Sequence, residues 1–117
     1  MTLYIAGPMR GYPAFNAAAF RAAATRLRSV GYAVLSPVEL DEGAGWNLDT
    51  MTEADLPPGW RRQVLRRDAA AISMSDGIAL LDDWSGSDGT FLEIVCARFV
   101  GIPAKEVDTW ASEAMKP

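Results

Sequence analysis

Apolar and polar positions follow two different periods along the chain, and the alternation between them predicts strands and helices in turn. Short continuous apolar runs bounded by glycine or proline predict strands, and apolar residues three or four positions apart predict amphipathic helices. The predicted strands cover residues 2–6, 32–37, 77–82 and 102–105. The predicted helices cover residues 14–30, 60–75, 90–100 and 108–115.

This order of elements predicts an α/β fold. Strands that alternate with helices form a parallel sheet covered on both faces, and right-handed crossovers leave few strand orders. With 117 residues the chain has the common size of one domain. We therefore expect a single domain over residues 1–117, a flavodoxin-like or Rossmann-like three-layer sandwich. Its four- to five-stranded parallel sheet should have the order 2-1-3-4.

The segment 38–59 interrupts the pattern. It is rich in acidic residues, glycine and proline and contains no basic residue. We expect a long loop with one helical turn, and loops of this length in compact domains are usually functional or mobile.

Composition limits the chemistry that the chain can perform. It contains no histidine and one cysteine, Cys96, which lies inside an apolar run. Histidine general bases, Ser-His triads, internal disulfides and multi-cysteine zinc sites are therefore excluded. The remaining candidates are carboxylates, tyrosine, serine and arginine, and we expect neither a metal nor a cofactor.

Charge and hydropathy narrow the set of partners. The formal net charge of −4 does not favour binding to a nucleic-acid polymer, although one or two arginines could hold a small phosphorylated ligand. No apolar run approaches the ~20 residues of a membrane span, and the N-terminus has no basic signal-peptide region. We expect a cytoplasmic protein. The nearly all-apolar helix 90–100 predicts a homodimer or larger homo-oligomer, because such a helix should be buried all round.

Two glycine-rich segments should meet at a ligand site. In open parallel sheets ligands bind beyond the carboxyl ends of the strands, at the point where the strand order reverses. Here that point lies between the first and third strands, where "GPMRG" (7–11) and "DDWSGSDGT" (82–90) follow. The second segment leads into a helix N-terminus that favours an anion. The candidate binding residues in these segments are Gly7, Pro8, Met9, Arg10, Gly11, Ser87, Asp88 and Gly89.

A simpler interpretation of these segments remains open. The glycines could serve only to make tight turns, and Ser87 or Asp88 could serve only as a helix cap. The carboxylate of Asp88 favours this alternative, because it would compete with a bound phosphate. Trp84 could form a wall for a flat ring or act as an ordinary hydrophobic anchor.

Two carboxylates lie in apolar surroundings. Glu93 is the only acidic residue in "GTFLEIVCARFVG", and Asp68 falls within an expected inner stripe of Trp60, Val64, Leu65 and Ile72. A buried aspartate is costly unless it is paired or functional. The alternatives are a solvent-facing strip for Glu93 and an ion pair for Asp68. Together with the hydroxyl of Tyr4, the two acids suit a retaining glycosidase, in which one carboxylate attacks the anomeric carbon and the other handles the proton.

The motifs "YIAGPMRG" and "SDGTFLE", with an aspartate near the end of the helix between them, resemble the nucleoside 2-deoxyribosyltransferase-like superfamily. The likeness is strongest to its small phage and bacterial relatives and to the deoxyribonucleoside 5′-monophosphate N-glycosidases. This resemblance implies that Glu93 is the nucleophile, that Asp68 is the acid or base and that Tyr4 orients Glu93. It also implies a phosphate site at Gly7–Gly11 and at Ser87 and Gly89.

The resemblance predicts cleavage or exchange of the base of a nucleoside or nucleoside 5′-monophosphate. Trp84 and Met9 are candidate walls of the base pocket. Ser87 favours nucleotides over nucleosides, whereas Pro8 and Asp88 oppose that preference. Two alternatives of other classes remain: a nucleotide-binding or sensing module without turnover, and a flavodoxin-like protein that binds flavin mononucleotide.

Overall fold

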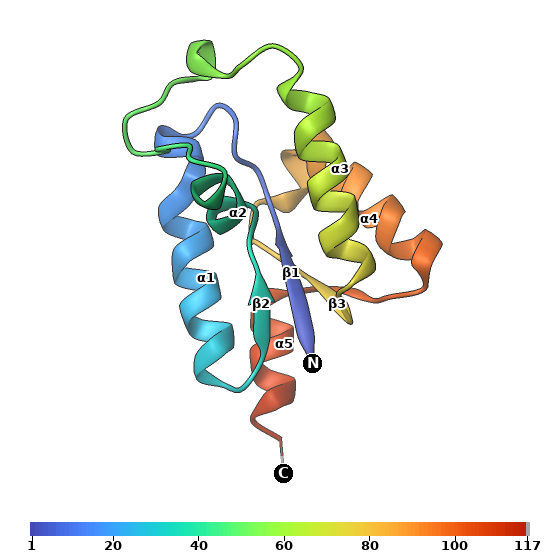
Figure 1. The fold of residues 1–117 in the computed structure, drawn as a ribbon. Coiled ribbons are helices and arrows are strands. Elements are labelled where there is room, and N and C mark those ends of the chain that lie inside the picture. Colours follow the sequence, from blue (N-terminus) through green and yellow to red (C-terminus); the bar gives the residue numbers. More distant parts are fainter. Residues whose placement is uncertain (117) are drawn as a thin grey trace.

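The computed structural model describes residues 1–116 and is shown in Figure 1. Within these residues it is an α/β protein built on a four-stranded sheet with the order β2-β1-β3-β4. All three neighbouring pairs of strands are parallel. The strands are β1 (Thr2–Ala6), β2 (Ala33–Leu35), β3 (Gly77–Leu80) and β4 (Ala104–Glu106). The predicted fold class and strand order are therefore confirmed.

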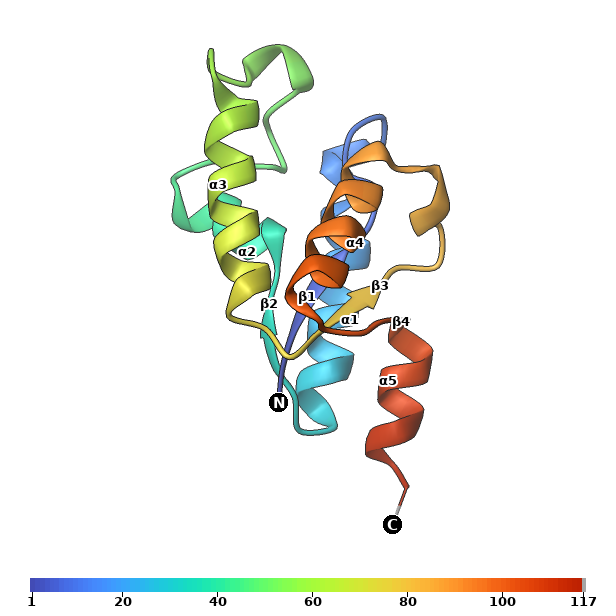
Figure 2. The ribbon, with the colours of Figure 1, turned by 90° about the vertical axis from the view of Figure 1, so that its right-hand side faces the viewer.

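Helices cover both faces of the sheet, as Figure 2 shows. The main helices are α1 (Ala17–Ser29), α3 (Trp60–Ser73), α4 (Asp88–Val100) and α5 (Val107–Ala114). Helices α1 and α5 contact each other over one face, and α3 and α4 contact each other over the opposite face. Short helical segments complete the chain: α2 (Pro37–Gly43), η1 (Pro13–Asn16), η2 (Glu53–Asp55) and η3 (Trp84–Gly86).

The central strand β1 divides its side chains between two separate apolar clusters. Leu3 and Ile5 belong to the cluster beneath α1 and α5. Tyr4 and Ala6 belong to the cluster beneath α3 and α4. Successive side chains of a strand point to opposite faces, and all four residues are fully buried. The parity of the strand therefore places Tyr4 on the α3–α4 face.

Gly7 allows the chain to leave β1 close to its neighbour. A Cβ atom at this position would lie 2.6 Å from Cδ1 of Leu81, which follows β3. Such a distance is well inside van der Waals contact, so a larger residue would displace the loop or the core. This glycine is therefore required by packing, independently of any ligand.

The segment 38–59 contains more helix than the sequence indicated. Helix α2 occupies seven residues, with Pro37 in its first turn, where a fixed φ and a missing N–H are tolerated. Leu48 is buried, and Trp46 packs against the cluster beneath α1 and α5. The remaining residues of the segment form turns, loop and η2. The prediction of one helical turn therefore underestimated the helical content of this segment.

The helix predicted over 14–30 begins three residues later, at Ala17. Ala14, Phe15 and Asn16 have φ values of 49°, 56° and 61°, in the left-handed region that side chains other than glycine rarely adopt. The amide of Asn16 donates to the carbonyl of Pro8 at 2.9 Å, and Phe15 is buried. Packing of this turn against the β1 loop therefore overrides its helical pattern.

In residues 1–116 no helix has the length and apolar character needed to cross a bilayer.

Candidate active site

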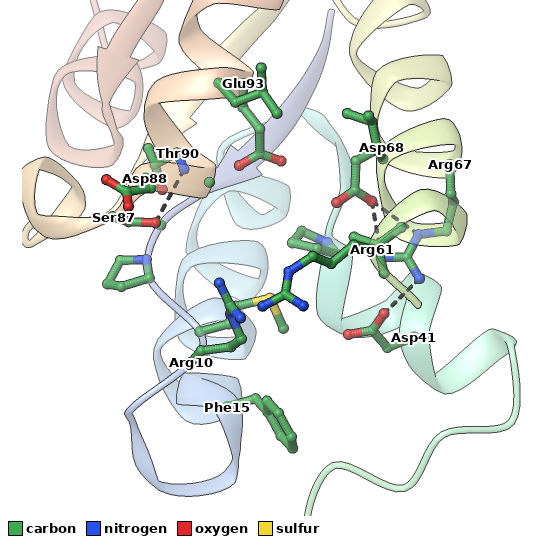
Figure 3. Close-up of a pocket in the computed structure, with 18 of the residues that line it drawn as sticks. Arg10, Phe15, Asp41, Arg61, Arg67, Asp68, Ser87, Asp88, Thr90 and Glu93 are labelled. Carbon is green, nitrogen blue, oxygen red and sulfur yellow. Dashed lines mark hydrogen bonds and ion pairs between the residues drawn. The ribbon is translucent and has the colours of Figure 1, made fainter. Parts of the chain in front are cut away.

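A pocket of about 660 Å³ opens at the carboxyl ends of β1 and β3. The loop after β1, the N-terminal turns of α4 and one side of α3 form its walls, as Figure 3 shows in part. Its volume lies within the range of small-molecule sites, roughly 300–1,000 Å³. The pocket occupies the switch point of the sheet, where the sequence predicted a ligand.

Most of the predicted site residues line this pocket. They are Gly7, Pro8, Met9, Arg10, Asp68, Ser87, Asp88, Gly89 and Glu93. Gly11 does not line it and instead makes a turn with a φ of 82°. Trp84 does not line it either, because its ring packs edge-to-face against Phe91 with centroids 5.9 Å apart. The structure thus assigns Trp84 the role of hydrophobic anchor rather than pocket wall.

Glu93 lies in the second turn of α4 and accepts a hydrogen bond from the hydroxyl of Tyr4. The pKa of Glu93 is raised to about 8, mainly by burial and in part by the charge of Asp68, whereas the Tyr4 hydroxyl and the Arg67 guanidinium act to lower it. The pKa of Tyr4 is raised well above its usual value, mainly by burial and then by Glu93 and Asp68. Tyr4 is therefore a neutral donor that holds the glutamate, which does not lie on a solvent-facing strip.

Asp68 lies on α3 and is fixed by Arg67. The Nε atom of Arg67 donates to Oδ1 of Asp68 at 3.0 Å, and its Nη1 atom lies 2.6 Å from Oδ1 of Asp41 on α2. Asp68 is 8% exposed and Asp41 is 4% exposed. Burial raises the pKa of each aspartate, and the Arg67 guanidinium opposes both rises. The ion pair that the sequence allowed for Asp68 is therefore present, and it joins α2 to α3.

The two acids face each other across the pocket. In Figure 3 the carboxyl groups of Asp68 and Glu93 project from α3 and α4 toward the space between those helices. The Tyr4 hydroxyl binds Glu93 and also lowers the pKa of Asp68. Three side chains from β1, α3 and α4 therefore converge, in an arrangement that could place a sugar between a nucleophile and a proton donor.

The inner stripe predicted for α3 is wrong in its first half. Leu65 is 47% exposed, and the buried residues of the helix are Asp68, Ala71 and Ile72. Figure 1 shows the reason: the first turns of α3 extend beyond the sheet, and only its later turns pack on it. Trp60, Val64 and Leu65 line the pocket instead of a core.

The N-terminus of α4 has the features of a capped helix end. Ser87 occupies the N-cap position, and its Oγ atom accepts the N–H of Thr90 at 3.1 Å. The carboxylate of Asp88 follows in the first turn. Negative charge is favourable at a helix N-terminus, so Asp88 already supplies what a bound phosphate would supply.

Several pocket residues carried no clear signal in the sequence. Asp41 lies in the segment expected to be mostly loop. Arg67 is one of several arginines in its helix, and helical periodicity alone did not show which of them faces the pocket. Arg61 and Trp60 line the pocket beside Arg10. In residues 1–116 no group of three or more metal-ligating acidic, cysteine or histidine side chains is positioned around one point.

Fold and pocket together define an α/β protein with a small-molecule site at the switch point of a parallel sheet. The chain belongs to the family DUF4406, a domain of unknown function, whose model matches residues 1–106. No curated protein sequence matches it.

The chain is also similar to a solved structure of a 2-deoxyribosyltransferase from the psychrotolerant bacterium Bacillus psychrosaccharolyticus. The superposition has a TM-score of 0.63 and 23% sequence identity, and it covers 89% of this chain and 69% of that chain. The chain therefore has the fold of this 2-deoxyribosyltransferase, as the resemblance predicted.

Proposed function

We propose that the protein cleaves or exchanges the N-glycosidic bond of a nucleoside or nucleoside 5′-monophosphate by a retaining mechanism. The observation that carries the proposal is that Asp68 and Glu93 line the same pocket, while the buried Tyr4 hydroxyl donates to Glu93 from beneath it. The fold shared with a 2-deoxyribosyltransferase supports the same class of substrate.

In the proposed first step, a carboxylate oxygen of Glu93 attacks C1′ of the sugar. The bond from C1′ to the base nitrogen breaks, and its electron pair stays on the base, which takes a proton from Asp68. The product is a glycosyl ester of Glu93, as in retaining glycosidases. The hydrogen bond from Tyr4 holds the attacking carboxyl group in place.

The second step regenerates the enzyme. Water attacks C1′ while Asp68 accepts its proton, and the bond to Glu93 breaks with release of the free sugar. Attack by the nitrogen of a second base gives transfer instead of hydrolysis. Both outcomes need the same two carboxyl groups, because Asp68 acts once as acid and once as base.

The pKa values predict a pH profile for this mechanism. Two interacting carboxyl groups titrate as a pair, so one proton is shared between Glu93 and Asp68 below about pH 8, and the reactive form is the one that carries it on Asp68. The raised pKa of about 8 at Glu93 marks the pH at which the pair loses its last proton. We expect kcat/KM to fall above about pH 8, measured with buffers of constant ionic strength. A rate that keeps rising beyond that pH would contradict the assignment.

The direct test follows base release by chromatography. The wild-type protein is incubated with deoxynucleosides and with their 5′-monophosphates, beside the variants Glu93→Gln and Glu106→Gln. Glu106 is exposed at the end of β4, so its variant serves as the matched control. We expect Glu93→Gln alone to lose release, and equal rates in all three proteins would refute the nucleophile. Tight nucleotide binding by calorimetry without release in the wild type would favour a binding or sensing module.

We also propose a homodimer in which a second copy covers the apolar side of α4. Val95 is 61% exposed and Phe99 is 91% exposed, and Phe91 and Leu92 are about half exposed on the same helix. An apolar patch of this kind marks an interaction site. Leu92 also lines the pocket, so the partner would lie near the pocket entrance.

Light scattering coupled to size-exclusion chromatography tests the dimer. We expect a dimeric mass for the wild type and for Phe99→Leu, and a monomeric mass for Phe99→Glu, whose charge would be buried at the interface. A monomeric wild type at micromolar concentration would overturn the proposal.

A further inference from the structure

Two arginines and a tryptophan form a cluster in the pocket that the two proposed chemical steps do not use. The guanidinium carbon of Arg10 lies 5.1 Å from the ring centroid of Trp60, and that of Arg61 lies 4.6 Å from the same centroid. Arg10 comes from the loop after β1, whereas Trp60 and Arg61 open α3. In Figure 3 the two guanidinium groups appear beside one another in the pocket.

The charges of this cluster are not neutralised by the protein. Within residues 1–116 neither Arg10 nor Arg61 forms an ion pair, in contrast to Arg67, which binds both Asp41 and Asp68. Stacking on an aromatic face stabilises a guanidinium group and leaves its in-plane N–H donors free. Two like charges held near one ring repel each other, and a dianion between them would relieve that repulsion.

The other candidate anion site in the pocket is less suitable. At the N-terminus of α4 the Ser87 Oγ atom is already an acceptor, and the Asp88 carboxylate adds negative charge. A phosphate there would meet like charge, whereas at Arg10 and Arg61 it would meet two free cations. Arginine also matches phosphate geometry with two parallel hydrogen bonds.

We propose that Arg61 joins Arg10, which the resemblance already placed at a phosphate site, in binding the phosphate of a nucleoside 5′-monophosphate, and that Arg61 determines the preference for nucleotide over nucleoside. Trp60 positions both guanidinium groups. This inference rests on the proposed function for its substrate class. The phosphate would then bind at the beginning of α3, whereas the sequence placed part of its site at the N-terminus of α4.

The test compares the preference of Arg61→Gln with that of the wild type. Preference is the ratio of kcat/KM for a deoxynucleoside 5′-monophosphate to kcat/KM for the same deoxynucleoside. We expect this ratio to fall at least about tenfold in Arg61→Gln, as removal of a charged hydrogen bond predicts. Arg62→Gln is the matched control, because Arg62 is exposed, forms no ion pair in residues 1–116 and does not line the pocket. An unchanged ratio in Arg61→Gln would overturn the inference.

A binding experiment separates this inference from the proposed catalysis. Calorimetry with the 5′-monophosphate and the nucleoside is performed on Glu93→Gln and on Glu93→Gln/Arg61→Gln. Nucleotide affinity that is lost only in the double variant supports the arginine site, even if the wild type releases no base. Equal affinities of both variants for the nucleotide would refute the arginine site, whatever the result of the base-release assay.

Discussion

The two faces of the sheet differ in what they bury. The α1–α5 face is packed with apolar side chains, and the indole Nε1 of Trp110 within it donates to the carbonyl of Ile78 at 2.8 Å. The α3–α4 face holds Asp68 and Glu93, and burial raises the pKa of both acids. Figure 2 shows α4 in front of the shared strands and α1 behind them. One central strand therefore supports both a conventional core and a polar pocket.

The two faces therefore have different roles: the α1–α5 face contributes stability, and the α3–α4 face carries the groups proposed for the chemistry. Burial of apolar surface stabilises the first face, whereas buried ionisable groups reduce stability unless they are paired or neutralised. We therefore expect substitutions on the α1–α5 face to lower stability, and substitutions among the pocket acids to change its dependence on pH. Four measurements test this division, given from the largest expected effect to the smallest.

The first measurement removes a large side chain from the apolar face. Phe20 is a fully buried residue of α1, so we expect Phe20→Ala to lower the free energy of unfolding by about 3–5 kcal/mol. Urea titration at pH 7 measures the change. Met74→Ala, at a position that is 70% exposed, should change stability by less than about 0.5 kcal/mol. Similar losses in the two variants would contradict the assignment of the core.

The second measurement breaks the ion pairs of the pocket face. Arg67→Met leaves Asp41 and Asp68 buried without their cation, and we expect a loss of about 3 kcal/mol at pH 7. Loss of the cation raises the folded-state pKa of both acids, so the defect should shrink as the pH falls and they become protonated. Urea titrations at pH 7 and pH 5 test this, with Arg66→Met, at an exposed position, as the control. A defect that grows toward low pH would show that Arg67 does not act through these carboxylates.

The third measurement concerns the proton on Glu93. Its pKa is about 8 in the folded protein, against 4.5 for an unperturbed glutamate, so the folded state keeps a proton that the unfolded state loses. The contribution of this proton to the free energy of unfolding is fully present below about pH 4.5 and is lost as the pH rises through 8. We expect the free energy of unfolding of the wild type to decline by about 2 kcal/mol across this range, and Glu93→Gln to remove that decline. The figure is smaller than the pKa shift alone implies because solvent reaches the pocket. Equal slopes of stability against pH in Glu93→Gln and the wild type would refute the shift.

The fourth measurement uses one substitution at two positions. Ala14 has a positive φ in the turn that carries Phe15 to the pocket, and Ala22 is an exposed residue inside α1. We expect Ala14→Gly to raise the free energy of unfolding by about 0.5–1 kcal/mol, because glycine adopts this conformation without strain. Ala22→Gly should lower it by about 1 kcal/mol. Thermal melts resolve the opposite signs, and a loss at both positions would exclude strain in the turn.

The sequence by itself determined the fold and singled out two acids, Asp68 and Glu93, that line the pocket. Apolar runs fixed the order of strands and helices, and the period of two in β1 separated Tyr4 from Leu3 and Ile5. The apolar surroundings of Asp68 and Glu93 marked them as unusual acids. These signals are local, because a periodic pattern states which face of its own element a residue occupies.

Tertiary structure alone decided the partners of these residues. Asp41 and Arg67 lie 26 positions apart and meet because α2 folds beside α3. Arg10 and Trp60 meet because the first turns of α3 extend past the sheet to the loop after β1. Trp84 turned toward Phe91 instead of the pocket. Such contacts depend on how far each element extends and how it packs on its neighbours, and the period of a single segment carries no information about either.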